Sequence, residues 1–541
     1  QSKIMASTHD LVIENARIVD GSGSPWYHGH LGITDGNIEV VERGHRHDLS
    51  GERVIDIDQD IIAPGFIDTH SHSDLEAFTD PTLAPKVRQG ITTEILGQDG
   101  YSMAPLLPST DVTEYRNQIK GLAGDLPEDE WTWTGVGEYL DRLESSGIAP
   151  NVATLVGHGT VRFNVLGMDD REPTEEELAE MRSLVSTSLE EGAVGFSTGL
   201  VYTPAVYSNT KEVKTLAKEL EPYGLPFVAH IRSLGRWVWD AIDEFLGIGA
   251  ETGVPLLFSH IILMGNAQHG NAERVLNRLE TARERGIDVV ADQHPYNAGS
   301  TMLLNTIPPW VKSNPAEILD RLQDEDVRDQ IRRDIREWRI DGWENVGELC
   351  GWDNVMISSV TSEENKHLEG QTVQEIADNR GTEVIATVCD ILFEERLQVS
   401  MILQSLYDET DVETFLQWEG TMFETDGLFG GNPHPRVYGS YPRILGHFVR
   451  DEESLSLEEA IRKMTSLPAR TLGLSSKGHI KPGFDADLVV FDPYIVEDQT
   501  TYENPQQYPR GISHVLVNGD FVVEGSETTD QTPGRAIKNS G

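Results

Sequence analysis

Apolar and polar residues alternate with two different periods along this chain of 541 residues. Over residues 9–62 and again over 485–523, apolar residues recur at every second position in short runs interrupted by Asp-Gly or Asn-Gly pairs, a pattern typical of β-hairpins. Between these regions, apolar runs alternate with amphipathic stretches of helical period. The pattern predicts a small β domain built from both chain ends, with an α/β domain between them.

The α/β region contains a series of apolar runs that we predict to be strands. They cover residues 65–70, 91–97, 151–157, 193–198, 225–230, 255–260, 287–293 and 421–426. The stretches between them include residues 174–190, which open with Thr174-x-x-Glu177, the pattern of a capping box at a helix start. Eight βα units in succession predict a (β/α)8 TIM-like barrel.

The gap between residues 299 and 420 is too long for a single loop. Its first part, about 310–352, contains Asn314-Pro315 and a charged run, and we expect a helical insertion near the barrel mouth there. The expected units are a small β-sandwich domain over 8–62 plus 472–525, a barrel over 63–471, and a polar tail over 526–541. We expect the tail to be disordered because it has few apolar residues to bury.

Acidic residues outnumber basic ones along the whole chain. Ninety Asp and Glu stand against 43 Lys and Arg, which gives a formal net charge of −47 and a pI near 4.6, and lysine supplies only 12 of the 43. This balance argues against nucleic acid and anionic membranes as partners, since both need basic patches. A diffusely acidic, lysine-poor surface suits concentrated salt, so we interpret the source as halophilic; an ordinary acidic mesophile is the alternative.

Composition also bounds the compartment and the partners. The two cysteines, Cys350 and Cys389, are too few for a disulfide framework or a Cys-rich zinc site. The sequence has no run of about 18 apolar residues, so it predicts no membrane-spanning helix. The residues before Met5 lack the apolar core of a signal peptide and are expected to be foreign to the natural start. These features predict a cytoplasmic protein that acts on a small molecule, with a homo-oligomer left open.

Histidines and an aspartate follow several of the predicted strands. His70 and His72 end the first strand and point to the same side, because side chains alternate along a strand. The set at the ends of strands one, five, six and eight is His70, His72, His230, His260 and Asp426. Each alone could be a core histidine or a capping aspartate. Together, on a fold whose strand ends converge, they have the spacing of a metal site.

These positions carry a resemblance to a known family. His-x-His after strand one, a histidine after strands five and six, and an aspartate after strand eight resemble the amidohydrolase superfamily. Further motifs resemble its D-aminoacylase (N-acyl-D-amino-acid deacylase) branch: Ala63-Pro64-Gly65-Phe66-Ile67-Asp68-Thr69-His70, Gln89-Gly90-Ile91-Thr92-Thr93, Asp292-Gln293-His294-Pro295-Tyr296, Thr425-Asp426-Gly427, His434-Pro435-Arg436 and Ser466-Leu467-Pro468-Ala469-Arg470. The resemblance covers nearly the whole chain. It implies metal-dependent hydrolysis of a linear amide, with deacylation of an N-acyl (D-)amino acid as the expected reaction.

The chain departs from that branch at three positions. Asp99 stands where the branch has a cysteine ligand; a carboxylate can replace the thiolate and can bridge two ions, but it is a harder ligand. Ile262 stands where the branch has a lysine that helps to bind the substrate carboxylate, and Leu234 stands where the branch often has an acid. These changes keep the metal chemistry and leave the acyl-D-amino-acid substrate open.

The resemblance also implies roles for individual residues. It implies one or two Zn²⁺ ions, with Mn²⁺ or Co²⁺ as alternatives, which activate water for attack on the amide carbonyl. The implied metal ligands are His70, His72, Asp99, His230, His260 and Asp426. Asp426 is also expected to carry the proton of the water to the leaving nitrogen. His158, after the third strand, is expected to polarise the carbonyl or orient the substrate, with a structural imidazole as the alternative.

Four further residues are candidates for substrate binding. Arg232, two residues past His230, is expected to hold a carboxylate, although a solvated or ion-paired arginine is the alternative. Arg436 and Tyr296 are candidates of the same kind. Tyr202 follows the fourth strand and is expected to line the pocket, with packing in the pocket wall as the alternative.

Two other functions compete with linear amide hydrolysis. A cyclic-amide hydrolase of the hydantoinase or dihydroorotase kind often uses a carboxylated lysine after strand four, where this chain has Phe196-Ser197-Thr198 and no lysine. A catalytically dead barrel that serves as a binding protein is the second alternative. The retained histidines and Asp426 argue against it. Metal analysis of the purified protein would separate a metal-dependent hydrolase from a dead scaffold, which need not hold stoichiometric metal.

We predict that the protein loses structure when salt is removed. The formal charge of −47 repels itself when it is unscreened. Thermal melts in low and in multimolar KCl measure the effect, and the melting temperature should rise with salt. An equal or higher melting temperature in low salt would contradict the halophilic interpretation.

Overall fold

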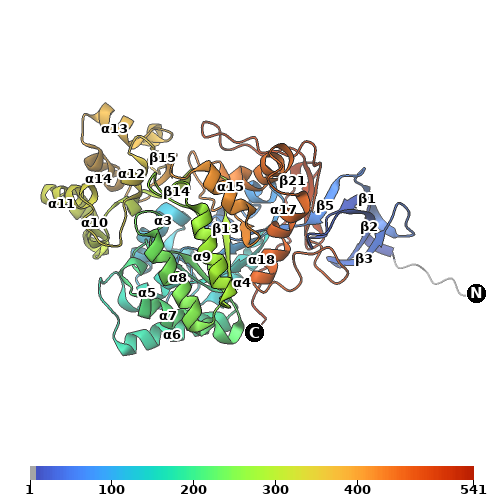
Figure 1. Ribbon diagram of the computed structural model, residues 1–541, viewed down its shortest axis with the longest axis horizontal. Coiled ribbons are helices and arrows are strands. Elements are labelled where there is room, and N and C mark those ends of the chain that lie inside the picture. Colours follow the sequence, from blue (N-terminus) through green and yellow to red (C-terminus); the bar gives the residue numbers. More distant parts are fainter. Residues whose placement is uncertain (1–7, 541) are drawn as a thin grey trace, which may run out of the picture.

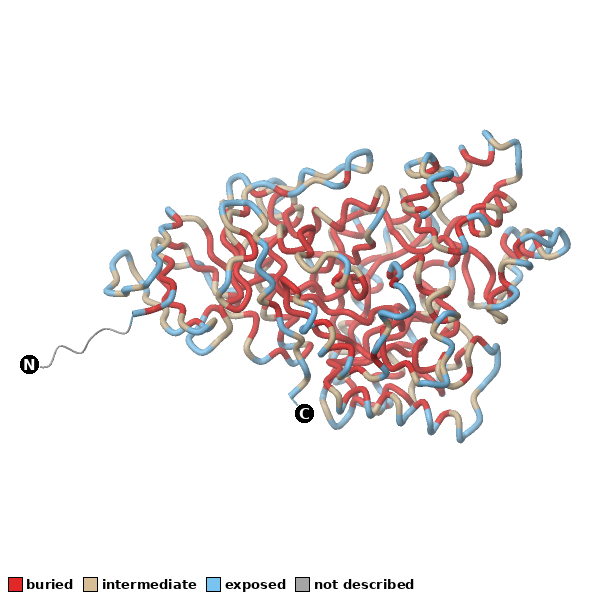
Figure 2. Tube along the Cα trace, turned by 180° about the vertical axis from the view of Figure 1, so that it is seen from behind, coloured by how far each residue is buried: buried red, intermediate tan, exposed pale blue. Residues whose placement is uncertain are grey.

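Figure 1 shows the computed structural model, which describes residues 8–540. The expectation about the residues before Met5 lies outside this range. A barrel occupies the middle of an elongated molecule, with a small β domain at one end and the insertion at the other (Figure 1). Buried residues run through the barrel and into both flanking parts (Figure 2). Within the described residues, no helix has the length and apolar character needed to cross a membrane.

The predicted (β/α)8 barrel is confirmed. Its strands are β6 (Phe66–Asp68), β7 (Ile91–Leu96), β8 (Asn151–Thr154), β9 (Val156–Gly157), β10 (Phe196–Gly199), β11 (Phe227–His230), β12 (Leu256–Phe258), β13 (Val289–Gln293) and β17 (Thr421–Phe423). All pair in parallel, in the orders β6-β7-β8 and β9-β10-β11-β12-β13-β17. Only Leu155 separates β8 from β9. The ring closes between the first and last strands, where Asp426 N donates to His70 O at 2.9 Å.

Helices cover the outside of the barrel because their apolar stripes face its strands. They include α4 (Val136–Ser146), α6 (Glu175–Glu190), α7 (Thr210–Ala217), α8 (Val238–Thr252), α9 (Ala272–Glu284), α15 (Glu409–Gln417) and α17 (Leu457–Met464). The capping box predicted for α6 is present: the Thr174 hydroxyl accepts from Glu177 N, and the Glu177 carboxylate accepts from Thr174 N. Inside the barrel, inward-facing residues such as Ile67, Val228 and Met422 form a separate apolar core.

The small β domain is built from both chain ends. Its strands are β1 (Thr8–Ile18), β2 (Tyr27–Thr34), β3 (Asn37–Arg43), β4 (Ser50–Asp56), β5 (Ile61–Pro64), β18 (Leu488–Phe491), β19 (Ile512–Val517), β20 (Asp520–Glu524) and β21 (Glu527–Thr528). They form one continuous nine-stranded sheet in the order β21-β20-β19-β18-β5-β1-β2-β3, with β4 also paired to β1. The antiparallel pair β5–β18 joins the two ends of the chain.

The insertion is wider than residues 310–352, and it contains a sheet as well as helices. Its three-stranded antiparallel sheet consists of β14 (Gly299–Met302), β15 (Val355–Ser359) and β16 (Ser400–Leu403). Its helices include α10 (Ile318–Gln323), α11 (Glu325–Arg336), α12 (Val346–Cys350), α13 (Val373–Arg380) and α14 (Val384–Glu394). Four- or five-residue strands leave too short a periodic signal to predict, so only the charged helical run was recognised.

The prediction of a disordered tail is wrong for its described part, residues 526–540. The main chain of the tail runs beside β8, where Val152 N donates to Arg535 O at 3.0 Å and Ile537 N donates to Val152 O at 2.7 Å. The Asn539 amide donates to Leu189 O and Ala193 O, each at 2.7 Å. Polar composition misled the prediction because hydrogen bonds hold much of this segment, and only a few apolar side chains, such as Ile537, pack against the barrel.

Candidate active site

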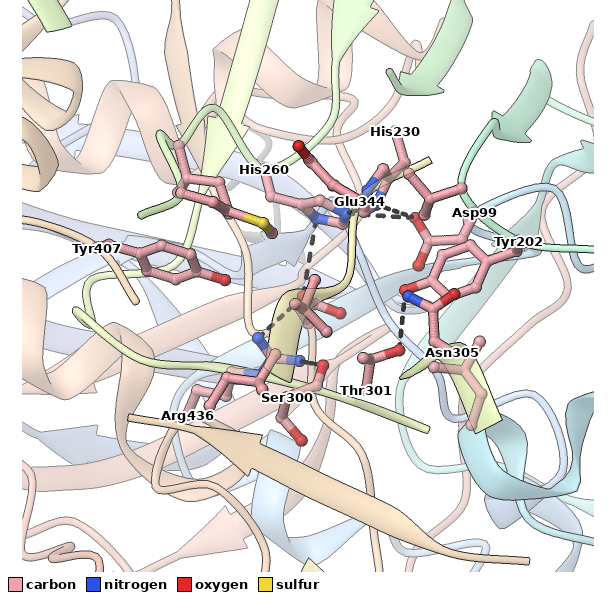
Figure 3. Close-up of a pocket in the computed structure, with 17 residues that line it drawn as sticks. Asp99, Tyr202, His230, His260, Ser300, Thr301, Asn305, Glu344, Tyr407 and Arg436 are labelled. Atoms are coloured by element: carbon pink, nitrogen blue, oxygen red, sulfur yellow. Dashed lines mark hydrogen bonds and ion pairs between the residues drawn. The ribbon is translucent and has the colours of Figure 1, made fainter. Parts of the chain in front are cut away.

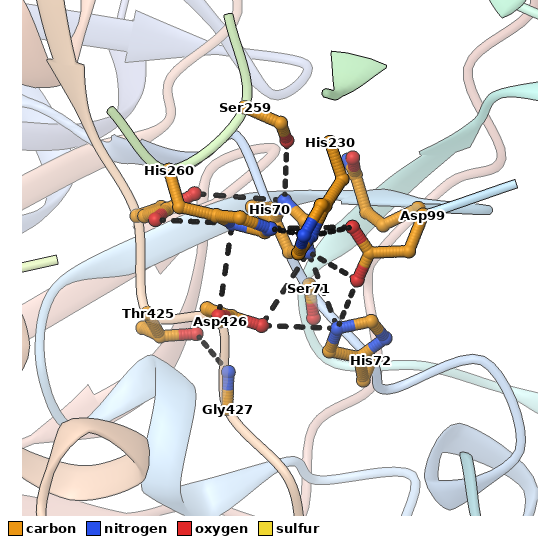
Figure 4. A network of polar contacts seen from close by, with 12 residues as sticks. His70, Ser71, His72, Asp99, His230, Ser259, His260, Thr425, Asp426 and Gly427 are labelled. Atoms are coloured by element: carbon orange, nitrogen blue, oxygen red, sulfur yellow. Dashed lines mark hydrogen bonds and ion pairs between the residues drawn. The ribbon is translucent and has the colours of Figure 1, made fainter. Parts of the chain in front are cut away.

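The histidines and the aspartate predicted at the strand ends converge on one point (Figure 4). The Nε2 atoms of His70 and His72 lie 3.2 Å apart, and His72 Nε2 lies 3.0 Å from Asp426 Oδ1. On the other side of the cluster, His230 Nδ1 lies 2.9 Å from His260 Nε2. All five side chains are buried or nearly so. Residues up to 356 positions apart in the sequence thus form one compact set of candidate metal ligands, as the barrel predicts.

Asp99 lies between the two histidine pairs and divides the cluster into two groups. Its Oδ2 atom lies 3.3 Å from His70 Nε2 and 3.4 Å from His72 Nε2. Its Oδ1 atom lies 3.3 Å from His260 Nε2 and 3.6 Å from His230 Nδ1. One group is His70, His72, Asp99 and Asp426, and the other is Asp99, His230 and His260. Each carboxylate oxygen of Asp99 therefore faces a different group.

The donor set fits metal ions. Zinc bonds of about 2.0–2.1 Å in a tetrahedron place neighbouring ligand atoms roughly 3.3 Å apart, close to the separations between these atoms. Asp99 Oδ1 is buried and has no hydrogen-bond partner among the described residues. The Nδ1 atom of His230 and the Nε2 atom of His260 point at each other, an arrangement that a shared cation stabilises. The two groups can hold two ions, with Asp99 between them.

Electrostatics keep the two carboxylates ready as ligands. Burial raises the pKa of Asp99, but His70 and His260 outweigh it and hold that pKa well below its usual range. Burial likewise raises the pKa of Asp426, but Arg436 and the same histidines bring it well below its ordinary value. Both side chains are therefore ionised at neutral pH.

The backbone is strained at three of the site residues. Asp99, His260 and Asp426 have φ angles of 57°, 40° and 48°, in the left-handed region that residues other than glycine rarely adopt. Each costs on the order of 1–3 kcal/mol, which surrounding contacts must offset. The loop of Asp99 also approaches β10 so closely that a Cβ at Gly199 would lie 2.3 Å from the Asp99 carbonyl oxygen. All three strained residues direct their side chains into the cluster.

A buried ion cluster beneath the histidines was not predicted from the sequence. The Lys86 ammonium donates to Asp68 Oδ2 and to Glu94 Oε1, each at 2.8 Å, and all three side chains are fully buried. Burial lowers the pKa of Lys86, but the two carboxylates outweigh it and raise that pKa above its usual value. The available signal was an acid within each of two apolar runs, at Asp68 and Glu94.

This cluster fixes the seam where the barrel closes. Asp68 Oδ1 accepts from Thr425 N at 2.9 Å, and Lys86 also donates to Thr425 Oγ1 at 3.0 Å. Glu94 Oε1 further accepts from Ser71 Oγ at 2.5 Å and from Ser73 Oγ at 2.7 Å. The residues next to His70, His72 and Asp426 are thereby bound to one buried charge.

A pocket opens beside the cluster (Figure 3). It is lined by Asp99, Leu122, Val201, Tyr202, His230, His260, Ile262, Met264, Ser300, Thr301, Asn305, Glu344, Val346, Leu403, Tyr407, Asp426 and Arg436. The insertion supplies much of this wall, and Glu344 attaches it to the loop after β11, accepting from Leu234 N and Gly235 N at 3.0 Å each. Sequence reasoning missed these wall residues because no local pattern links the insertion to the barrel.

Of the predicted substrate residues, Arg436 and Tyr202 lie at the pocket. Arg436 Nη1 lies 2.9 Å from Asp426 Oδ2, and Nη2 donates to Ser300 O at 2.9 Å. The Tyr202 hydroxyl and Thr301 Oγ1 are hydrogen-bonded at 2.8 Å, and the tyrosine ring meets the His230 ring edge-on at 5.4 Å. Both residues are therefore placed to contact a ligand.

The structure does not bring the other three candidates to the pocket. His158 is fully buried, with Nδ1 bonded to Thr198 Oγ1 and Nε2 bonded to Glu212 Oε1, each at 2.8 Å. Arg232 forms a bidentate ion pair with Glu244, at 3.0 and 2.9 Å. Tyr296 packs against the ring of His434, with centroids 5.2 Å apart, and does not line the pocket. The structural alternatives expected for His158 and Arg232 match these contacts.

A parallel barrel with clustered histidines and carboxylates at the carboxyl ends of its strands defines a class of metal-dependent hydrolases. Comparison with known proteins places the chain within that class. The model of the amidohydrolase family matches residues 53–523, and the chain belongs to this family. A D-aminoacylase from Alcaligenes xylosoxydans xylosoxydans is 32% identical over 537 residues, which cover 98% of this chain and 97% of that protein.

Solved structures agree with the family assignment. N-acyl-D-glutamate deacylase from Bordetella bronchiseptica, complexed with zinc and a phosphonate mimic of the tetrahedral intermediate, superposes with a TM-score of 0.82 at 31% identity and covers 98% of this chain and 100% of its own. A D-aminoacylase with a binuclear metal centre superposes equally well, with the same identity and coverage. The resemblance to the amidohydrolase superfamily and to its D-aminoacylase branch is therefore confirmed.

We predict that Lys86→Met destabilises the protein strongly. It leaves Asp68 and Glu94 buried without their cation, and loss of one partner from a buried ion pair costs about 3–5 kcal/mol. The control is Lys211→Met, because Lys211 pairs with Glu175 at 3.0 Å on the surface. Such pairs contribute at most about 1 kcal/mol. Thermal melts of both variants in the same salt measure the difference, and Lys86→Met should melt at a lower temperature than Lys211→Met. Equal melting temperatures would contradict this role for Lys86.

We predict that Asp99→Ala lowers bound metal and activity together, because both groups lose a shared ligand. Added metal should partly restore activity. Asp99→Cys should recover binding and shift the preference toward Zn²⁺, because a thiolate is a softer ligand than a carboxylate. Metal content per chain and activity against added metal measure both effects. Unchanged metal content in Asp99→Ala would show that Gln98-Asp99-Gly100 is only a turn.

Proposed function

We propose that this protein is a zinc-dependent deacylase that hydrolyses the linear amide of N-acyl-D-amino acids with apolar side chains. The observation that carries the proposal is the double ligand group around Asp99, which opens onto a pocket containing Arg436. Membership of the amidohydrolase family supports the reaction class. The D configuration rests on the likeness to D-aminoacylase and N-acyl-D-glutamate deacylase.

The residues of the chain divide the chemistry between them. Bound zinc would polarise the amide carbonyl and lower the pKa of a coordinated water. Asp426 is placed to accept a proton and return it to the leaving nitrogen, because it lies at the pocket edge with Oδ1 beside His72. The Arg436 ion pair holds Oδ2 and fixes the orientation of this carboxylate. Residues of the insertion cover the site and limit the access of bulk water.

Arg436 is the group best placed to bind the substrate carboxylate. It is 1% exposed and is the one arginine or lysine among the described residues that line the pocket. Its Nε–H is buried and has no hydrogen-bond partner among the described residues, and the same holds for Ser300 Oγ beside it. A buried donor without a partner is costly, and an incoming carboxylate would satisfy it with a charge-assisted hydrogen bond.

The rest of the pocket favours an apolar side chain over an acidic one. Ile262, Met264 and Val346 line it together with Leu122, Val201 and Leu403. No lysine stands at position 262, and the remaining charge in the insertion wall is the carboxylate of Glu344. A second carboxylate on the substrate would be buried without a cation, which is unfavourable. The pocket therefore suits leucine- or methionine-like side chains better than glutamate.

Two features argue against the alternative functions. In β10, where a carboxylated lysine would be needed for the cyclic-amide mechanism, Ser197 donates to Gly97 O and accepts from Gly100 N. Asp99, which belongs to both candidate ligand groups, would supply the shared ligand instead. A catalytically dead scaffold would have no need for the strained backbone at Asp99, His260 and Asp426, because such strain costs free energy and is typical of functional sites.

A substrate panel tests the proposal. The zinc-loaded protein in multimolar KCl is offered N-acetyl derivatives of D- and L-leucine, methionine, glutamate and aspartate, together with hydantoins. We expect kcat/KM for N-acetyl-D-leucine to exceed that for N-acetyl-D-glutamate by at least about tenfold. Asp426→Asn should keep the fold and most of the metal, and lower kcat by about 10²–10⁴-fold.

Two results would overturn parts of this proposal. Preference for N-acetyl-D-glutamate or for hydantoins would reject the apolar linear substrate. An Asp426→Asn variant within a few-fold of wild type would remove Asp426 from the mechanism. Ile262→Lys serves as a matched specificity variant, because it adds one cation to the wall and should narrow the gap between the D-leucine and D-glutamate substrates.

A further inference from the structure

Glu424 lies behind the metal-ligand cluster, between two histidines that belong to different ligand groups. It follows β17 directly and is fully buried. Its Oε2 atom lies 3.6 Å from His70 Nδ1, and its Oε1 atom lies 3.7 Å from His260 Nδ1. Neither oxygen has a hydrogen-bond partner among the described residues. A buried carboxylate without such a partner is unfavourable unless a nearby charge stabilises it.

The two histidines point their other nitrogens into the cluster. His70 turns Nε2 toward Asp99 Oδ2, and His260 turns Nε2 toward Asp99 Oδ1. If the Nε2 atoms ligate metal, both Nδ1 atoms carry hydrogen and act as donors. Their separations from Glu424 are a few tenths of an ångström longer than a hydrogen bond. The Glu424 carboxylate therefore faces one potential donor with each oxygen.

Other acceptors near these two donors are already engaged or serve only one of them. Asp426 Oδ2 also lies 3.7 Å from His260 Nδ1, but it is held by Arg436 at 2.9 Å. Asp292 accepts from Thr69 Oγ1 and from His260 N, each at 2.8 Å. Ser259 Oγ lies 3.0 Å from His70 Nδ1 alone. Glu424 is the one group in this set that faces both histidines.

We propose that Glu424 is a positioning residue that holds His70 and His260 through their Nδ1–H groups and so couples the two metal positions. A carboxylate behind a ligating histidine fixes its tautomer and ring orientation and raises its basicity as a ligand. Here one carboxylate acts on a ligand in each group, so its loss weakens both. The inference rests on the metal-dependent function proposed above, but metal binding tests it independently of turnover.

A competing role for Glu424 is direct coordination of a metal. His70, His260 and Glu424 offer ligand atoms within 4.8 Å of one another, but there the Nδ1 atoms face Glu424, away from Asp99. A second such group is His294, Glu424 and Asp426, and neither nitrogen of His294 has a hydrogen-bond partner among the described residues. In that arrangement His294 would be as necessary for metal binding as Glu424. In the positioning role, removal of the His294 imidazole leaves both metal positions unchanged.

The test measures the affinity of each metal position in variants of the full chain. Protein loaded with Co²⁺ is titrated with a chelator while the visible absorption of Co²⁺ and the metal content per chain are followed. Glu424→Gln keeps the shape and removes the charge, and it should weaken both positions by about 10–100-fold. Ser259→Ala, which removes a neighbour of His70 only, should weaken one position. His294→Ala should retain both.

The outcomes distinguish the positioning role of Glu424 from direct coordination of a metal together with His294. Wild-type affinities at both positions in Glu424→Gln would overturn the proposal, as would equal metal loss in Glu424→Gln and His294→Ala. If Glu424→Gln does not fold, Glu424→Asp replaces it in the same assay. This variant keeps the charge but moves it away from both histidines, so it should also weaken both metal positions. A wild-type protein that binds two Co²⁺ ions but deacylates none of the panel would reject the proposed substrate and leave this result intact.

Discussion

One buried ammonium group, that of Lys86, holds the catalytic end of this barrel in place. A closed parallel barrel has no edge strand, but its first and last strands come from distant parts of the chain and must be joined. Lys86 joins them by binding Asp68 on one strand and Thr425 beside the other, while Glu94 adds a second carboxylate from β7. The candidate metal ligands His70, His72 and Asp426 follow this seam directly in the sequence. Their geometry therefore depends on a charge that no ligand touches.

The site above that seam combines a high density of buried polar groups with backbone strain. Four imidazoles and the carboxylates of Asp99 and Asp426 are gathered in a buried volume, and three of these candidate ligands adopt left-handed backbone conformations. Metal ions bound by these imidazoles and carboxylates would neutralise the negative charge of the carboxylates. Metal binding would therefore stabilise the fold, because a ligand that binds only the native state stabilises that state by mass action.

Much of the barrel and its ligand set could be predicted from the sequence, because each signal is local. Each predicted strand carries an apolar run, and His70, His72, His230, His260 and Asp426 follow those runs directly. What could not be predicted depends on contacts between distant segments. Glu344 of the insertion accepts hydrogen bonds from the loop after β11, His158 pairs with Glu212, and main-chain hydrogen bonds attach the tail to β8. None of these has a periodic pattern, and a buried ion cluster such as that of Lys86 appears in the sequence only as isolated charges.

The sheet shared by both chain ends has a consequence for biosynthesis. β5 pairs with β18, and the tail pairs with β8, so residues near the start of the chain find their partners only among the last to be made. A ribosome must release nearly the whole polypeptide before the N-terminal strands gain their final neighbour. Until then β5 exposes an unpaired edge, which invites pairing with other chains. Late closure of this kind makes folding slow and exposes intermediates to aggregation.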